Sequence, residues 1–244
     1  MKIQQVDNRR YLVAIKKYRD EVSKDWFDPQ QLQSNDEVIG QSVGRSTTYF
    51  FEKAGKHFVL RKYFRGGLLS KWVEDSYFYL GVRRTRAYLE QAMLKKMRKL
   101  QLPVPEPVAL LISKKGLLYR ASIIIRLIKN SRDLFHILRE RALTDSEWIQ
   151  VGALIKQFHD QGVYHSDLNI HNILMDDEGA LWLIDFDKGR FVEPNASNLE
   201  SNLSRLQRSL DKESKKWPQF HWRAPDWDLF MTGYEQAQSQ KSGD

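Results

Sequence analysis

The first half of the chain holds short runs rich in apolar, β-branched and aromatic residues that are bounded by turn residues, a pattern typical of strands. These runs predict strands at residues 11–15, 38–39, 47–51, 57–63, 108–112 and 117–128. Gly40, Gly44 and Gly55 mark turns between the second, third and fourth of these strands. A strand-rich first half that forms a β-sheet is therefore expected.

Two helices interrupt the strands of the first half. Asp28-Pro29 is a typical helix start, because a capping residue precedes a proline at the first helical position. A longer helix is predicted at residues 85–100 from apolar residues at helical spacing, namely Leu89, Met93, Met97 and Leu100. The proline-rich residues 102–107 end it, since a residue that precedes proline avoids helical backbone.

The second half reads as mainly helical. Ser131 is expected to cap a short helix, and Thr144 with Glu147 forms the sequence pattern of a capping box. The helix that follows carries one apolar stripe, Trp148, Val151, Ile155 and Phe158, and stops at Gly162. A loop at residues 165–171, short strands at 172–175 and 181–184, and a helical remainder from residue 190 complete the chain. The change of pattern near residues 126–131 predicts two lobes.

Composition and charge narrow the class of protein. The 244 residues contain 41% hydrophobic and 29% charged side chains, which is a globular balance. Cysteine is absent, which excludes disulfides, thiol catalysis and cysteine-zinc sites. The net charge of +8 favours polyanionic partners such as nucleotides, nucleic acids or anionic membranes. With no signal core and no apolar run of the ~18 residues that a span needs, we expect neither export nor a membrane-spanning segment.

The residues with the clearest chemistry lie in the loop and in the strand pair after it. Asp167 follows His165 by two residues, Asn172 follows Asp167 by five, and an Asp-Phe pair begins at Asp185. Protein-kinase catalytic loops have this spacing. It predicts that Asp167 meets an acceptor hydroxyl, while Asn172 and Asp185 supply hard oxygen ligands for Mg²⁺. The alternative is an ordinary polar loop whose carboxylates accept backbone hydrogen bonds.

A kinase-like second half requires a nucleotide clamp in the first half. The segment 39–48 holds Gly40, Gly44, Arg45 and Thr47 between two predicted strands, where backbone N–H groups could approach phosphates. It is not a full G-x-G-x-x-G and also fits a plain hairpin.

A cation on the third strand of the clamp is the next expected element. Arg61 and Lys62 are adjacent candidates that point to opposite faces, so only one can face the nucleotide. Glu90 is the only acidic residue among seven basic ones between Arg83 and Lys99, and we expect it to pair with that cation from the edge of the helix's apolar stripe. Alternatively, it is a surface carboxylate among lysines.

Over nearly its whole length the chain resembles the 3-deoxy-D-manno-oct-2-ulosonic acid (Kdo) kinases, a family of lipopolysaccharide core kinases. The matching segments are 39–50 (IGQSVGRSTTYF), 60–68 (LRKYFRGGL), 102–107 (LPVPEP), 165–174 (HSDLNIHNIL) and 183–189 (LIDFDKG). The resemblance implies an α+β, protein-kinase-like, two-lobed fold. Residues 1–128 would form a strand-rich N-lobe with one long helix, and residues 129–244 a small, mainly helical C-lobe, with a nucleotide cleft between them.

The resemblance also implies an activity: an ATP-dependent sugar kinase that uses Mg²⁺ and phosphorylates a hydroxyl, the 4-OH, of the Kdo sugar on a lipid A precursor. Asp167 would be the catalytic base, with Asn172 and Asp185 as Mg²⁺ ligands. Arg61 becomes the favoured phosphate anchor, because the family has arginine there while the position of Lys62 varies. The enzyme would act at the cytoplasmic face of the inner membrane of a Gram-negative bacterium, peripherally, with no nucleic acid or protein partner implied. A core heptose or another small alcohol stays an alternative acceptor.

Three features stay open. Asp187, where protein kinases have glycine, could contact a metal or cap a turn. The basic-aromatic stretch 65–80, with Lys71 and Trp72, could touch a membrane or lie in the core. The tail between Arg205 and Arg223 has six basic and two acidic residues, and could contact acceptor phosphates or be a solvated helix face.

Two functions of other classes compete with the kinase. His165, Asp167 and His171 could be the start of a metal-hydrolase cluster, which would leave Asn172 and Asp185 unexplained. The net charge could alternatively mark a nucleic-acid binder, although the chain carries no such motif.

Overall fold

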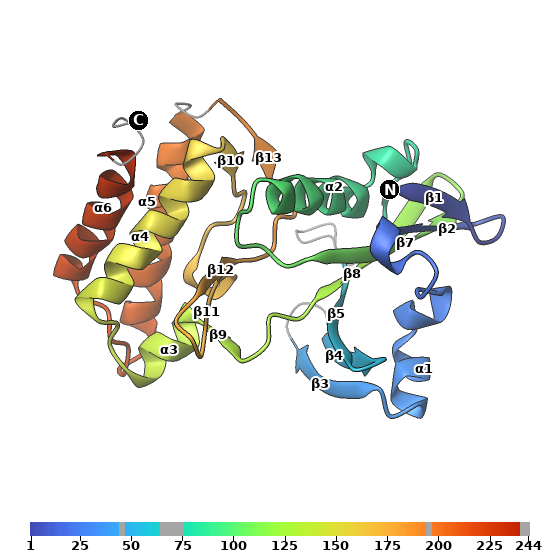
Figure 1. The fold of residues 1–244 in the computed structure, drawn as a ribbon, viewed down its shortest axis with the longest axis horizontal. Coiled ribbons are helices and arrows are strands. Elements are labelled where there is room, and N and C mark those ends of the chain that lie inside the picture. Colours follow the sequence, from blue (N-terminus) through green and yellow to red (C-terminus); the bar gives the residue numbers. More distant parts are fainter. Residues whose placement is uncertain (44–46, 64–75, 194–196, 240–244) are drawn as a thin grey trace. The chain divides into compact units, whose positions relative to one another are not determined.

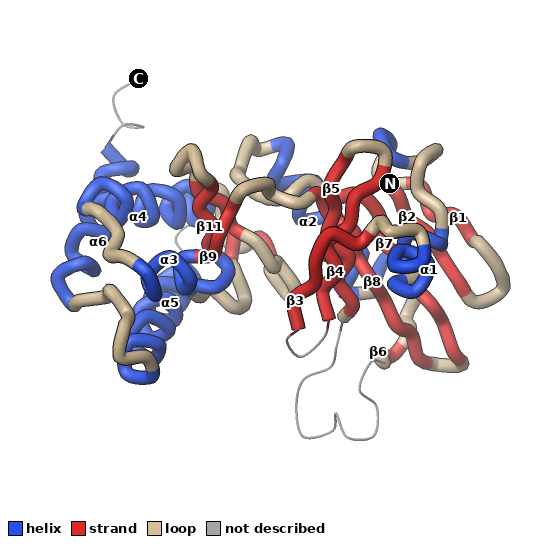
Figure 2. The backbone as a smooth tube through the Cα atoms, turned by 90° about the horizontal axis from the view of Figure 1, so that it is seen from below, coloured by secondary structure: helices blue, strands red, loops and turns tan. Residues whose placement is uncertain are grey.

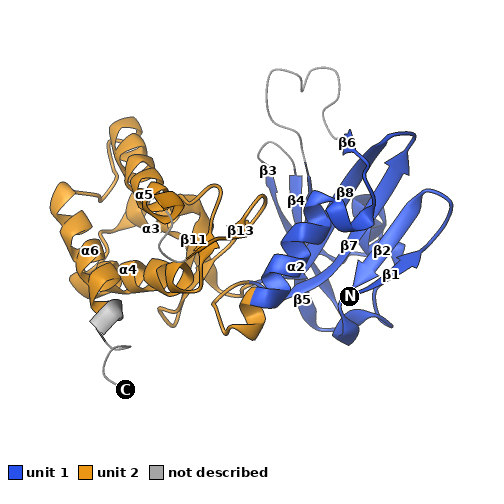
Figure 3. Ribbon diagram, turned by 90° about the horizontal axis from the view of Figure 1, so that it is seen from above, with its two compact units in different colours: residues 1–96, 105–127 blue, residues 97–104, 128–244 orange. Residues whose placement is uncertain are grey.

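A computed structural model describes residues 1–43, 47–63, 76–193 and 197–239 and divides the chain into two compact units (Figure 3). Unit 1 comprises Met1–Lys96 and Pro105–Leu127, and unit 2 comprises Met97–Val104 and Ile128–Asp244. The predicted boundary at residue 128 left residues 97–104 in the first lobe. They join unit 2 because Leu102 and Val104 are buried and the Leu183 N–H donates to the Pro103 carbonyl at 3.0 Å.

Unit 1 is built on an antiparallel sheet with the strand order β1-β2-β7-β8-β5-β4-β3, with β6 paired to β8 (Figure 1). Its strands are β1 (Lys2–Gln5), β2 (Arg10–Ala14), β3 (Val38–Val43), β4 (Thr47–Lys53), β5 (Lys56–Lys62), β6 (Tyr77–Phe78), β7 (Pro107–Lys115) and β8 (Leu118–Arg126). The sequence pattern missed β1 because this edge strand buries none of its side chains and has one apolar residue, too few for an apolar run.

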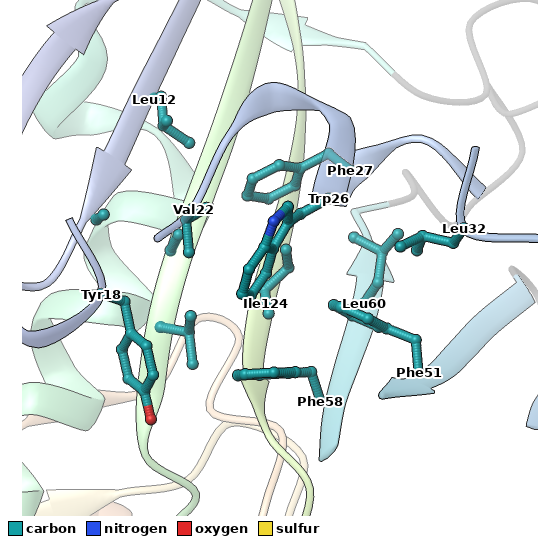
Figure 4. Packing of buried hydrophobic residues seen from close by; sticks show 13 residues of the cluster. Leu12, Tyr18, Val22, Trp26, Phe27, Leu32, Phe51, Phe58, Leu60 and Ile124 are labelled. Carbon is teal, nitrogen blue, oxygen red and sulfur yellow. The ribbon is translucent and has the colours of Figure 1, made fainter. Parts of the chain in front are cut away.

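Short helical segments between β2 and β3 cover one face of the sheet of unit 1. The 3-10 turns η1 (Lys16–Tyr18) and η2 (Lys24–Phe27) and the helix α1 (Pro29–Ser34) cover one face, and the Asp28 carboxylate caps α1 by accepting from the Gln30 N–H. Below them lies an aromatic core in which Trp26, Phe51 and Phe58 face one another (Figure 4). Their ring centroids are 5.1–6.0 Å apart. Because strand side chains alternate, burying Phe58 and Leu60 on this face turns Arg61 to the other.

The helix α2 (Arg86–Lys99), which follows the turn η4 (Val82–Arg84), buries part of the face that the sequence predicted, since Met93 and Met97 are buried. Leu89 is 56% exposed and Leu100 is 37% exposed, so the apolar stripe drawn through them is wrong at both ends. Glu90 is instead on the buried face at 4% exposure. A carboxylate can lie there because it accepts hydrogen bonds from Arg61 of β5 and from Tyr63 just after that strand, which hydropathy alone does not reveal.

Unit 2 contains four helices in its described part and three short strand pairs (Figure 2). The helices are α3 (Leu134–Glu140), α4 (Asp145–Asp160), α5 (Ser197–Lys216) and α6 (Ala224–Ser239). The strands are β9 (Ser131–Asp133), β10 (Val163–Tyr164), β11 (Ile173–Asp176), β12 (Leu181–Leu183) and β13 (Arg190–Phe191), paired β9-β11, β11-β12 and β10-β13. Ser131 is not the cap of α3, because it lies in β9; the Asp133 carboxylate caps the helix by accepting from the His136 N–H at 2.8 Å.

The α4 helix has the predicted limits and the predicted face. The Thr144–Glu147 capping box is present, and the whole stripe from Trp148 to Phe158 is buried. Helix α6 lies alongside α4 (Figures 1 and 3). Their backbones meet at two glycines: a Cβ added at Gly152 would lie 1.9 Å from the Phe230 carbonyl oxygen, and one at Gly233 would lie 1.9 Å from that of Ile149.

No helix in the described ranges combines the length and the apolar character that a membrane crossing requires.

Candidate active site

The imidazole of His165 holds the catalytic loop in unit 2. Its Nδ1 accepts a hydrogen bond from the Asp167 N–H at 3.1 Å, and its Nε2 donates to the Ile184 carbonyl at 2.9 Å. The two bonds require the neutral ring with the proton on Nε2. Burial lowers the pKa of His165, which keeps the ring neutral. The ring therefore joins the loop before Asp167 to the segment before Asp185.

Two more side chains fix the same loop. Asn202 of α5, which is fully buried, accepts from the His165 N–H at 3.0 Å and donates to the His165 carbonyl at 2.7 Å. The Ser166 hydroxyl donates to the Asp187 carbonyl at 2.5 Å. Thus Ser166, which stands where protein kinases have arginine, bonds backbone, and Asp187 takes part in the loop's structure through its carbonyl group.

Asp167 presents its carboxylate to solvent from this rigid loop. Its side chain is 68% exposed, while its carbonyl accepts from the amide groups of Asn169 and Asn172, both at 2.9 Å. The Nη1 of Arg205 in α5 lies 3.6 Å from Asp167 Oδ1. A carboxylate that is fixed by its backbone and open at its tip is suited to accept a proton from a bound hydroxyl.

Asn172 and Asp185 come together through the β11-β12 hairpin. The Ile184 N–H donates to the Asn172 carbonyl at 2.9 Å, which places Asp185 beside the end of the short η5 turn (Ile170–Asn172). The Asn172 Nδ2 is bonded to Asp167, so its Oδ1 is the atom left for a cation. Asp185 has left-handed backbone, with φ of 62°, a region that aspartate tolerates better than most residues. An amide oxygen and a carboxylate fit the hard-ligand preference of Mg²⁺.

Unit 1 contributes an ion pair on the α2 face of its sheet. The Arg61 Nη2 lies 2.5 Å from Glu90 Oε1, and the Tyr63 hydroxyl donates to Glu90 Oε2 at 2.5 Å. The Glu90 side chain is 2% exposed and that of Arg61 is 21% exposed, whereas Lys62 is exposed. Of the two candidate cations, the structure thus pairs Arg61 with Glu90. Tyr63 was missed by the sequence reading because nothing in its local pattern marks a carboxylate partner.

The candidate phosphate loop is only partly described. Gly40 lies in β3 opposite Phe50, where a Cβ would make ordinary contact at 3.6 Å, and Thr47 begins β4. Gly44 and Arg45 lie outside the described residues. So do Lys71 and Trp72 of the basic-aromatic stretch, of which Tyr77 and Phe78 form β6.

The hydrolase alternative has no support in unit 2. Both ring nitrogens of His165 are bonded to backbone, and His171 instead lies against Phe135, with ring centroids 4.5 Å apart. Within the described part of the chain, no three histidine, aspartate or glutamate side chains converge closely enough to hold a metal ion.

A second buried imidazole, His159, gives the fold a predictable pH dependence. It lies between α4 and α6 with its Nδ1 2.8 Å from the Tyr234 hydroxyl, and burial lowers its pKa to about 4. Between pH 4 and 6.5 the unfolded chain therefore binds more protons than the folded chain. Acidification across this window should lower the free energy of unfolding by about 3 kcal/mol from His159 alone, with His165 acting in the same direction.

The measurement is urea unfolding of the wild type and of His159→Gln at pH 7, 6, 5 and 4.5. The variant is expected to lose a clear part of the slope, whatever its stability at pH 7. His221→Gln makes the same substitution at an exposed histidine and serves as the control; the slope should change less than in His159→Gln. An unchanged slope in His159→Gln would contradict the assignment.

Known proteins resemble this chain over most of its length. The sequence model of the "Lipopolysaccharide kinase (Kdo/WaaP) family" matches residues 30–234. The 3-deoxy-D-manno-octulosonic acid kinase of Vibrio cholerae is 40% identical over 212 residues, covering 82% of this chain and 90% of that protein. The protein of the same name from Haemophilus influenzae is 35% identical over 220 residues, covering 87% of this chain and 90% of its own. A solved structure, the Cydia pomonella granulovirus kinase PK-1, gives a TM-score of 0.45 at 16% identity, covering 68% of this chain and 58% of that one.

The matched region includes the strands of the first unit from β3 onward and the catalytic loop of the second. The chain is accordingly a kinase, as the spacing of Asp167, Asn172 and Asp185 predicts. More narrowly, it belongs to the lipopolysaccharide kinase (Kdo/WaaP) family.

Proposed function

We propose that this chain transfers the γ-phosphoryl group of ATP to the 4-hydroxyl of the Kdo sugar on a lipid A precursor, in the synthesis of the lipopolysaccharide inner core. The observation that carries the proposal is Asp167: a solvent-facing carboxylate on a loop fixed by His165 and Asn202, in a chain 40% identical to a Kdo kinase. Phosphoryl transfer needs little more of a protein than accurate positioning and charge stabilisation.

Each site residue then has a role that its surroundings support. Asp167 orients the acceptor hydroxyl and takes its proton as the new P–O bond forms and the bond to ADP breaks. Asn172 Oδ1 and the Asp185 carboxylate would hold Mg²⁺, which neutralises charge on the ATP phosphates when bound. Arg61, oriented by Glu90, holds phosphate oxygens, with the segment around Gly40, Gly44, Arg45 and Thr47 as the backbone cradle.

The choice of Arg61 over Lys62 as anchor makes a testable prediction. Arg61→Lys keeps the charge but loses the planar fork, so it should raise the KM for ATP about tenfold or more and lower the melting temperature, while Lys62→Met should change neither much. Arg61→Met removes a cation beside the buried Glu90 and risks unfolding. The double variant Arg61→Met with Glu90→Met separates the structural role of Arg61 from its role in ATP binding. Recovered stability without recovered ATP use would support Arg61 as the phosphate anchor, and recovered ATP use would contradict that role.

We also propose where the enzyme works. The acceptor is a lipid and ATP is cytoplasmic, so the chain would act peripherally at the cytoplasmic face of the inner membrane of a Gram-negative bacterium. Vibrio and Haemophilus relatives and the net charge of +8, which favours anionic membrane surfaces, support this location.

The direct test is incubation of the protein with Mg-ATP and a Kdo-bearing lipid A precursor, followed by mass spectrometry. One added phosphate on the Kdo is expected, and NMR of the product would show whether it is on the 4-hydroxyl. If the lipid stays unmodified while the protein binds Mg-ATP, the acceptor is wrong, and heptose-extended core becomes the next substrate to try.

A further inference from the structure

One face of α5 carries a row of exposed basic residues, which we call the basic stripe: Arg205, Arg208 and Lys212. Their spacing of three and four residues stacks them on one side of the helix. Lys215 and Lys216 continue the row at the end of α5. Arg205 lies 3.6 Å from the Asp167 carboxylate, and Lys212 lies 3.9 Å from the buried Glu213. The exposed Asp211 follows Arg208 by three residues, and its carboxylate accepts from the Trp222 indole N–H at 3.0 Å.

The opposite face of α5 fixes how the stripe is oriented. Its buried residues are Leu199, Asn202, Leu206, Leu210 and Glu213. Two of its polar groups bond the catalytic loop directly: Asn202 holds the His165 backbone, and the Ser209 hydroxyl accepts from the Ile170 N–H at 3.3 Å. Because these bonds lie on both sides of Asp167 in the sequence, the stripe and the carboxylate belong to one rigid arrangement within unit 2.

The basic stripe begins beside the Asp167 carboxylate and extends away from it along α5. Arg205 reaches within 3.6 Å of the Asp167 carboxylate, and the helical rise puts Lys212 roughly 10 Å further along α5. A ligand whose hydroxyl meets Asp167 would therefore have the rest of its structure beside Arg208 and Lys212.

The positive charge of the basic stripe favours the binding of an anionic ligand. Like charges three and four residues apart on a helix repel one another, and the exposed contact of Arg205 with Asp167 compensates little of this. The sugar in the relatives' name, 3-deoxy-D-manno-octulosonic acid, is itself an acid. Under the proposed function, the lipid A precursor that carries this sugar adds phosphate groups. Such an acceptor presents several anionic groups close to the hydroxyl that is phosphorylated.

We propose that the basic stripe of α5 is the acceptor-binding surface, holding the carboxylate and phosphate groups of the sugar lipid while its hydroxyl meets Asp167. This inference rests on the proposed function for the identity of the acceptor. Arg205 lies next to the reacting centre, and Arg208 and Lys212 hold the anionic groups further from it. These two residues determine which acceptors bind and take no part in the transfer step.

The test measures binding without ATP, so that it does not depend on turnover. Wild type, Arg208→Glu and Lys212→Glu are titrated with the Kdo-bearing lipid A precursor in neutral detergent, and with the same lipid after enzymatic removal of its phosphates. Each variant should bind the intact lipid about tenfold or more weakly than the wild type, since each loses a charge-assisted contact. The difference between variant and wild type should shrink on the dephosphorylated lipid.

A matched control separates this contact from net charge. Arg120→Glu makes the same charge change at an exposed position of β8, in unit 1, and should bind the lipid as the wild type does. Arg208→Lys, which keeps the charge, should recover most of the affinity. In turnover, Arg208→Glu should raise the KM for the acceptor with the KM for ATP unchanged.

Three results would overturn the inference. The first is wild-type affinity for the lipid in both charge-reversal variants, and the second is an equal loss of affinity in Arg120→Glu. The third is equally tight binding of the wild type to phosphatidylglycerol vesicles that hold no acceptor, which would make the stripe a general membrane contact. The failure of this inference can be told apart from the failure of the proposed function. A wild type that binds the acceptor through the stripe but transfers no phosphate contradicts the function alone, and a wild type that phosphorylates it without stripe dependence contradicts the stripe alone.

Discussion

Asp167→Asn is expected to lower the turnover of the Kdo acceptor by at least about 10²-fold and up to about 10⁴-fold, the range that a general base contributes. The amide keeps the size and one oxygen of the carboxylate, but it cannot take the proton of the attacking hydroxyl. The fold should not change, because the Asp167 side chain is 68% exposed and the loop is held by its backbone N–H and carbonyl. The melting temperature and the affinity for Mg-ATP should therefore stay near the wild-type values.

The measurement is the initial rate of phosphate transfer at saturating acceptor, with ATP binding and thermal unfolding measured in parallel. Asp177→Asn is the matched control, because it makes the same change at an exposed aspartate in the turn after β11. A rate within tenfold of the wild type in Asp167→Asn would refute the role of the base. A loss of ATP affinity or stability of the same size would instead assign Asp167 to binding or to structure.

The second large effect is on stability: Gly152→Ala, and separately Gly233→Ala, should prevent unit 2 from folding normally. Alanine in a helix is favoured over glycine by about 1 kcal/mol, so propensity alone predicts stabilisation. The steric clash outweighs this gain in helix propensity, because each added Cβ would lie 1.9 Å from a carbonyl oxygen of the facing helix. Backbone cannot rotate away as a side chain can, so α4 and α6 must separate. We expect a loss on the order of 4 kcal/mol or more, a large part of the ~5–15 kcal/mol of a typical domain.

Urea unfolding followed by circular dichroism, together with the soluble yield, measures this loss. Gly40→Ala is the control substitution, because among the described residues its Cβ would meet the Phe50 ring alone, at 3.6 Å, an ordinary contact. It should change stability by less than about 1 kcal/mol. Variants of Gly152 and Gly233 that unfold at wild-type urea concentrations would mean that the two helices lie further apart than the structure places them.

Local signals in the sequence anticipated much of this molecule. The Thr144–Glu147 capping box forms as predicted, because both of its bonds join residues three positions apart. The strands from β3 to β8 other than β6 were found for a similar reason, since short apolar and aromatic runs between turn residues are also local signals. The pattern failed on α2, where it could not foresee that sheet residues satisfy the carboxylate of Glu90 and allow it to be buried while Leu89 is exposed.

The sequence by itself determined the spacing of Asp167, Asn172 and Asp185, because that spacing depends on one loop and one hairpin, and it was enough to indicate a kinase. Only the tertiary structure decided that Arg61 rather than Lys62 pairs with Glu90, that Asn202 holds His165, and that the basic stripe of α5 begins at Asp167. These contacts join residues 29 to 38 positions apart in the chain. They depend on which face each helix and strand turns toward its neighbour, and that is settled by the packing of the whole unit rather than by any local run of residues.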